Sequence, residues 1–98
     1  MTLLQETIRV LDENGKKPQD VLWVGINDCH FTWADFVNLA DVEYDDGFGA
    51  VEVREDLLIV GTNWWLERRE YDGSEWWAFK TRPEKPSQYR VPHSLFND

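Results

Sequence analysis

Apolar residues near the start of the chain recur at helical spacing. Leu4, Ile8 and Leu11 lie at i, i+4 and i+7 with mostly polar residues between them, so one face of a helix would hold all three. Gly15 follows at the place where a residue in the left-handed conformation commonly ends a helix. The pattern predicts a helix over residues 3–13.

A capping box marks the start of a second helix. Thr32 is followed three residues later by Asp35, while Phe31 and Phe36 occupy the positions of a hydrophobic staple. Apolar residues continue at helical spacing beyond this start. We therefore predict a helix over residues 33–42 that packs an aromatic-rich face on a sheet.

Several short runs have the composition of strands. Residues 21–26 are β-branched and aromatic and predict a strand, with a turn at 27–30. Val51 and Val53 alternate with charged residues, which is typical of an exposed edge strand. Residues 57–60 are apolar without a break, as in a central strand covered on both faces.

The strongest hairpin signal is the dipeptide Asp72-Gly73 between two strand-like runs, 64–71 and 75–81, because both residues tolerate the positive φ of a type I′ turn. The resulting register separates an apolar face from a mixed face. We expect toward the core Trp64, Leu66, Arg68, Trp77 and Phe79. The mixed face holds Trp65, Glu67, Arg69, Tyr71, Trp76, Ala78 and Lys80.

These elements predict an α+β fold: an antiparallel sheet of four to five strands with two helices packed largely on one face. A chain of 98 residues fits one domain, since two pieces would each be too short to bury a core. We expect this domain over residues 1–82. Prolines from residue 83 onward predict an extended tail over 83–98, which Val91, Leu95 and Phe96 would re-anchor.

The composition excludes some settings. The single cysteine, Cys29, precludes an intramolecular disulfide and suits a reducing compartment. Glu6 and Arg9 interrupt the first apolar run, so it does not read as a signal peptide, and no stretch approaches the roughly 18 apolar residues of a membrane span. We expect a protein of the bacterial cytoplasm with no membrane partner.

The net charge of −9 comes from the first part of the chain: residues 1–56 hold thirteen acids and four bases, whereas 57–98 hold six of each. Such a field repels phosphates and attracts basic surfaces. We therefore expect no direct nucleic-acid binding and either a basic protein partner or solubility alone. The densest acidic stretch has Arg54 as its single base and comprises Asp41, Glu43, Asp45, Asp46, Glu52, Glu55 and Asp56.

Motifs for metal binding or catalysis are incomplete. Four acids fit the first, third, fifth and twelfth positions of an EF-hand loop: Asp41, Glu43, Asp45 and Glu52. The match fails at position 6, where Asp46 replaces the required glycine and Gly47 comes one residue late, so a solvated acidic turn is the simpler interpretation. One cysteine and two histidines, His30 and His93, fall short of a zinc site and form no evident catalytic pair. We expect no cofactor and no enzymatic activity.

The mixed hairpin face has the composition of an interface, since Trp, Tyr and Arg are enriched in binding hot spots. We name Trp65, Arg69, Tyr71 and Trp76 as candidate contacts beside the acidic stretch. Large aromatics are mostly buried, which favours the alternative that a helix or the tail covers Trp65 and Trp76 and that Arg69 stacks on Trp76.

Three rival functions stay open. The chain binds a host protein stoichiometrically; or it holds a small ligand or substrate in a pocket lined by Trp23, Trp33 or Trp64 with a buried acid; or it forms a homo-oligomer through the Trp65 and Trp76 face. A flat or convex acidic surface would favour the first over the second.

The stretches ADVEYDDGFGA (residues 40–50) and NWWLERREYDGSEWWAFK (residues 63–80) resemble small uncharacterised proteins of Firmicutes phages, prophages and integrative elements. The resemblance spans about residues 3–83 and assigns no catalytic residue. It implies a setting in which small acidic proteins include anti-CRISPR inhibitors that imitate the charge of DNA. A phage accessory protein of that kind would act on a host protein with a basic surface, although the neutral second half departs from a uniformly acidic mimic.

Overall fold

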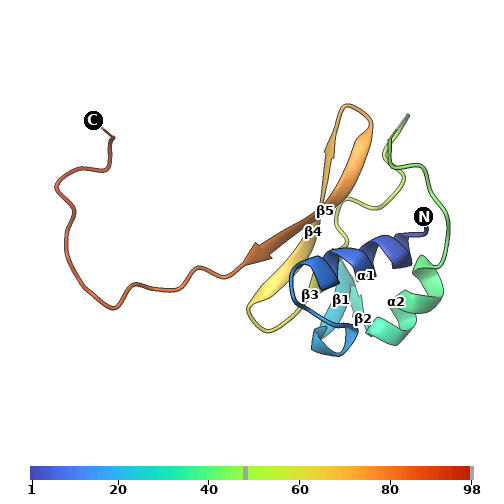
Figure 1. Ribbon diagram of the computed structural model, residues 1–98, viewed down its shortest axis with the longest axis horizontal. Helices are drawn as coiled ribbons and strands as arrows, with labels where there is room; N and C mark the ends of the chain where they lie inside the picture. Colours follow the sequence, from blue (N-terminus) through green and yellow to red (C-terminus); the bar gives the residue numbers. More distant parts are fainter. Residues whose placement is uncertain (48, 98) are drawn as a thin grey trace.

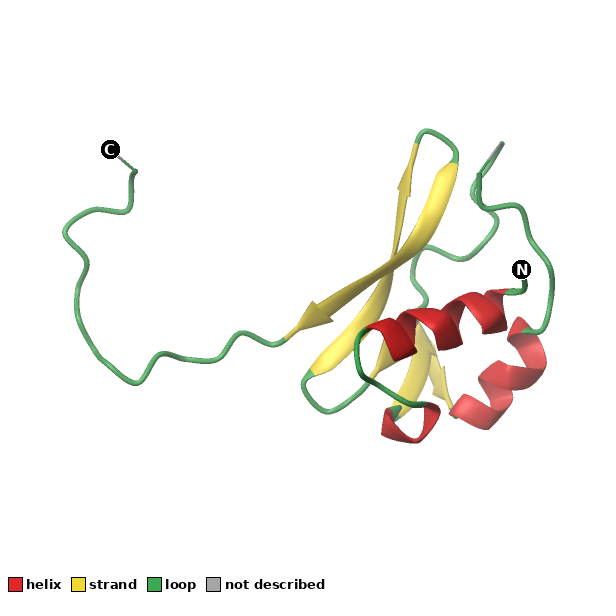
Figure 2. Ribbon diagram, viewed as in Figure 1, coloured by secondary structure: helices red, strands yellow, loops and turns green. Residues whose placement is uncertain are grey.

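The computed structural model describes residues 1–47 and 49–97, and over them the chain forms two α-helices and one five-stranded antiparallel sheet. The strand order is β2-β1-β3-β4-β5, and the helices lie on the same side of the sheet (Figures 1 and 2). The predicted α+β class is confirmed. The elements are α1 (Leu3–Glu13), a 3-10 turn (Pro18–Asp20), β1 (Trp23–Ile26), β2 (Cys29–Phe31), α2 (Trp33–Ala40), β3 (Leu58–Val60), β4 (Trp64–Tyr71) and β5 (Ser74–Thr81).

Each helix starts at a capping box. The Thr32 hydroxyl accepts the backbone N–H of Asp35 at 3.1 Å, as the sequence predicted, and Thr2 does the same for Gln5 at 3.0 Å. Helix α1 ends at Glu13, and Gly15 after it has the expected positive φ of 70°. Helix α2 ends at Ala40, two residues before the predicted end.

The β4–β5 hairpin has the register that the Asp-Gly turn predicted. Tyr71 pairs with Ser74, and the two turn residues have φ of 51° (Asp72) and 86° (Gly73). Trp64 and Trp77 on the helix side are each 5% exposed. Together with residues of both helices and of β1 and β3, they form the core cluster: Leu11, Val24, Phe36, Ala40, Leu57, Ile59, Trp64, Leu66 and Trp77.

Two local predictions are wrong. Residues 29–31, placed partly in a turn, form β2 and pair with β1 across a turn at residues 27–28. Residues 51–53, predicted as an edge strand, lie in a loop. There the amides of Glu52 and Val53 bind the Glu75 carboxylate instead of a neighbouring strand.

The segment after β5 leaves the domain. Residues 82–97, which we call the tail, are exposed, contain no helix or strand, and run away from the sheet (Figure 1). The helices among the described residues are too short to cross a membrane.

Candidate binding surfaces

The side of the sheet opposite the helices is a candidate interaction surface. We call it the outer face; alternation along the strands places on it Trp23 from β1, Leu58 and Val60 from β3, Trp65, Glu67 and Arg69 from β4, and Trp76, Ala78 and Lys80 from β5. Among the described residues, no helix packs on it. One row of paired positions reads Trp23, Val60, Trp65 and Lys80 from strand to strand.

The aromatic residues of the outer face remain accessible. Trp23 is 38% exposed, Trp76 is 43% exposed and Trp65 is half-buried. The expectation that a helix covers Trp65 and Trp76 is therefore wrong, because both helices pack on the opposite side. Nor does Arg69 stack on Trp76; its guanidinium pairs with Glu67 at 2.8 Å.

Glu67 organises the centre of the outer face. One carboxylate oxygen accepts the indole N–H of Trp65 at 2.8 Å, and the other lies 2.8 Å from the Arg69 guanidinium. The three residues alternate along β4, so they project from the same side of the strand. Glu67 thus limits the rotamers of both neighbours before any partner arrives, which lowers the entropy lost on binding.

The acidic stretch forms the long loop between α2 and β3. Several of its carboxylates have structural roles: Glu52 accepts the Asp45 N–H at 2.7 Å, Asp45 accepts the Gly47 N–H at 3.0 Å, and Glu43 pairs with the Met1 amino group at 2.7 Å. These acids fold the loop, but they stay exposed and keep their charge on the surface. Asp41, Asp46 and Glu55 are exposed as well.

Part of the acidic loop meets the hairpin. A hollow of about 570 Å³ is lined by Glu55 and Asp56 of the loop and by Glu67 and Arg69 of β4, among others. The backbone carbonyl of Asp46 accepts the Glu75 N–H at 2.9 Å, so the loop lies along the edge of β5. The structure therefore brings two residues of the acidic stretch, Glu55 and Asp56, to the same hollow as Arg69 of the mixed hairpin face. Tyr71, 76% exposed, lies at the tip of the hairpin.

Asp56 is held by two donors. Arg54 donates to both of its carboxylate oxygens at 2.9 Å, and the backbone N–H of Asn27 donates at 3.1 Å. The hydrogen bond with Arg54, followed by that with Asn27, holds the pKa of Asp56 well below its usual value. The same pair raises the pKa of Arg54.

A buried polar network that sequence reasoning missed supports this loop from the helix side. Arg68 lies 3.2 Å from Glu6 of α1 and 3.0 Å from Glu75 of β5, and all three are at least 92% buried. Tyr44 donates to Glu6 at 2.6 Å and accepts from Arg68 at 3.2 Å. The Trp77 ring centroid lies 4.7 Å from the guanidinium carbon.

The charge balance of this network follows from its contacts. Burial lowers the pKa of Arg68, but the hydrogen bond and charge of Tyr44, the charge of Glu6 and the hydrogen bond to Glu75 outweigh it and raise the pKa overall. Burial, then the hydrogen bond to Glu6, raises the pKa of Tyr44 far above its usual 10.0. A charged residue predicted on a core-facing side, as Arg68 was, is the sequence signal for such a network, because it requires buried partners.

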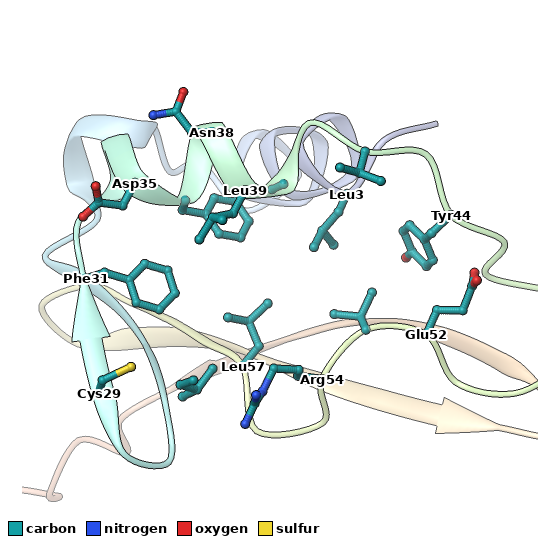
Figure 3. Close-up of a pocket in the computed structure, with 15 residues that line it drawn as sticks. Leu3, Cys29, Phe31, Asp35, Asn38, Leu39, Tyr44, Glu52, Arg54 and Leu57 are labelled. Carbon is teal, nitrogen blue, oxygen red and sulfur yellow. The ribbon is translucent and has the colours of Figure 1, made fainter.

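An apolar groove with a volume of about 770 Å³ lies between α2 and the segment before β3 (Figure 3). Phe31 and Leu57 point into it, while Arg54 and Asn38 point away. The groove is lined by none of Trp23, Trp33 and Trp64, the residues proposed for a ligand pocket. The two buried acids of the core, Glu6 and Glu75, are paired with Arg68, and neither lines this groove.

Candidate metal ligands do not converge. Over the described part of the chain, no group of three or more His, Cys, Asp and Glu could hold a metal ion, and this includes the EF-hand-like acids. Cys29 and His30 alternate along β2 and leave opposite faces of the sheet, and His93 lies in the tail.

Comparison with known proteins finds no family model that matches this chain, and neither a curated protein nor a solved structure is significantly similar to it.

Proposed function

We propose that this chain is a non-enzymatic binding protein that engages one protein partner through the outer face and the adjoining acidic loop. The observation that carries the proposal is the accessibility of three aromatic side chains on the outer face, Trp23, Trp65 and Trp76, on the same sheet as the hollow that Glu55 and Asp56 line together with Glu67 and Arg69. Aromatic anchors beside a charged rim are the usual anatomy of an interface.

The partner is a protein with a basic surface. The acidic loop offers seven acids against one base, and such a field steers a basic partner toward the sheet. Proteins that bind nucleic acid carry basic surfaces, which an acidic loop attracts. With the resemblance to mobile-element proteins, this favours a nucleic-acid-binding host complex, inhibited by occupation of its basic cleft.

The test is capture from a Firmicutes lysate with the tagged chain and matched variants, followed by binding kinetics with the protein recovered. Within the described residues, the side chains of Asp46 and Glu55 form neither a cap nor an ion pair, so Asp46→Lys with Glu55→Lys reverses loop charge without unfolding the loop. Asp12→Lys with Glu13→Lys changes the net charge equally on α1.

We expect the loop variant to slow association and the α1 control to change it far less, because steering depends on where the charge lies and is screened over roughly 8 Å. Trp76→Ala should speed dissociation by costing on the order of 2 kcal/mol, the scale of a hot spot. The proposal is contradicted if no protein is recovered, or if the loop variant and Trp76→Ala both fold and bind with the kinetics of the wild type. Concentration-dependent light scattering that Trp76→Ala abolishes would instead indicate a homo-oligomer.

A further inference from the structure

The apolar groove lies on the helix side of the sheet, away from the outer face, and part of its lining belongs to the acidic loop. Its lip carries two large apolar side chains that remain in water: Leu39 is 69% exposed and Val42 is 60% exposed. With Phe31 and Leu57 inside, the groove forms a continuous apolar surface, and such surfaces on proteins generally have an occupant.

The tail also exposes large apolar side chains. Tyr89, Val91, Leu95 and Phe96 are 73–91% exposed, a concentration of apolar surface in a segment without helix or strand. While the tail is extended, these side chains stay in water and contribute no hydrophobic stabilisation.

We propose that the tail folds back and docks in the groove of its own chain, with Leu95 and Phe96 against the wall formed by Phe31, Leu39 and Leu57. One apolar surface then covers the other. Both surfaces belong to the same chain, so no further molecule is needed.

The tether is long enough. Strand β5 ends at Thr81, and the groove lies near β1 and β2, three to four strands away, or about 19 Å at the usual spacing. The fourteen residues from Thr81 to Leu95 extend to roughly 46 Å, which leaves slack for a path around α1. A tethered segment has a high effective concentration, which favours the same chain over a second copy.

Charge also favours docking. Residues 82–98 carry three bases, Arg82, Lys85 and Arg90, against two acids, Glu84 and Asp98, a net charge of +1, while residues 1–81 hold seventeen acids and seven bases. Asp35 and Glu52 line the groove and are exposed. The basic tail is therefore attracted to the surface around the groove.

The single cysteine provides the test, since Cys29 lines the groove and is exposed when the tail is extended. A small thiol reagent should modify Cys29 of the full chain at least about threefold more slowly than Cys29 of the double variant Leu95→Ser with Phe96→Ser. A threefold ratio corresponds to a tail that is docked about two-thirds of the time and leaves the thiol accessible for the remaining third. Tyr89→Ser is the control: it removes a comparable apolar side chain outside the proposed anchors and should react like wild type.

Two measurements complete the test. The methyl NMR signals of Leu39 and Leu57 should move in the double variant and stay in place in the control. The protection of Cys29 should not depend on protein concentration. Equal thiol rates with unmoved methyl signals overturn the proposal, and so does protection that grows with concentration, which would assign the groove to the tail of a second copy.

Discussion

The indole N–H of Trp77 in β5 donates to the hydroxyl of Thr7 in α1 at 2.8 Å, and both residues are buried. The Thr7 hydroxyl in turn donates to the Leu3 carbonyl at 2.7 Å, so it is satisfied both as donor and as acceptor. This bond fixes how α1 sits on the hairpin.

Replacing Thr7 by valine should therefore destabilise the protein by about 1–3 kcal/mol, because the shape is kept while a buried indole N–H loses its acceptor. Thr81→Val is the control, since Thr81 is exposed at the end of β5. Urea titration measures both. Equal stability of the two variants would show that the bond contributes nothing.

Glu75→Gln should cost on the order of 3 kcal/mol, because it leaves the buried Arg68 with one carboxylate fewer. It should also speed hydrogen exchange at the amides of Glu52 and Val53, which the carboxylate binds. Glu70→Gln is the matched control for Glu75→Gln, because Glu70 pairs with Glu75 in the strand register but is exposed. If Glu70→Gln loosens the loop as much, Glu75 is not its anchor.

Alkaline pH should weaken the fold through Tyr44. The raised pKa means that the folded chain keeps the phenolic proton while the unfolded chain loses it above its usual value of 10.0. The contribution is thus fully present below pH 10 and declines as the pH rises from there toward the folded pKa. Absorbance of phenolate in the native state up to about pH 11 should be equal in wild type and Tyr44→Phe; extra absorbance in wild type would place Tyr44 outside the network.

Acid should remove a smaller contribution at Asp56. Its folded pKa is below the usual 3.8, so the stabilisation is present above that value and is lost as the pH falls below it. The stability difference between wild type and Asp56→Asn should be constant near neutral pH and shrink below about pH 4. A difference that persists in acid would assign the effect to hydrogen bonding alone.

Gly61→Ala tests the close packing of Trp64. A Cβ at Gly61 would clash with the buried indole of Trp64, so the ring must move, at a cost of about 1–3 kcal/mol. At Gly47 the nearest atom would be 3.9 Å away, and Gly47→Ala should change stability far less. Equal melting temperatures of the two variants would contradict this packing.

The features predicted correctly from sequence depend on neighbours along the chain. Thr32 with Asp35, and Asp72 with Gly73, specify a helix start and a hairpin register within four residues, and that register fixed which hairpin residues face outward. The failures depend on distant partners. Val51 and Val53 alternate like a strand, but whether a strand forms depends on a partner strand, and the amides of residues 52 and 53 bind the Glu75 carboxylate instead.

The candidate surfaces were predicted in composition but not in arrangement. Nothing near Glu75 in the sequence indicates that its carboxylate anchors residues 52–53, and nothing near Arg68 names Glu6, 62 residues away, as its partner. The groove is likewise absent from the sequence analysis, because its walls come from α2, from β2 and from the loop before β3.

The contacts between α1 and the hairpin also set the order of folding. They join residues 62 and 70 positions apart, so a large loop must close before either contact stabilises anything. An isolated helix of eleven residues is marginal in water. We therefore expect α1 to become stable only after β4 and β5 have paired, and the first helix of the chain to be among the last elements to form.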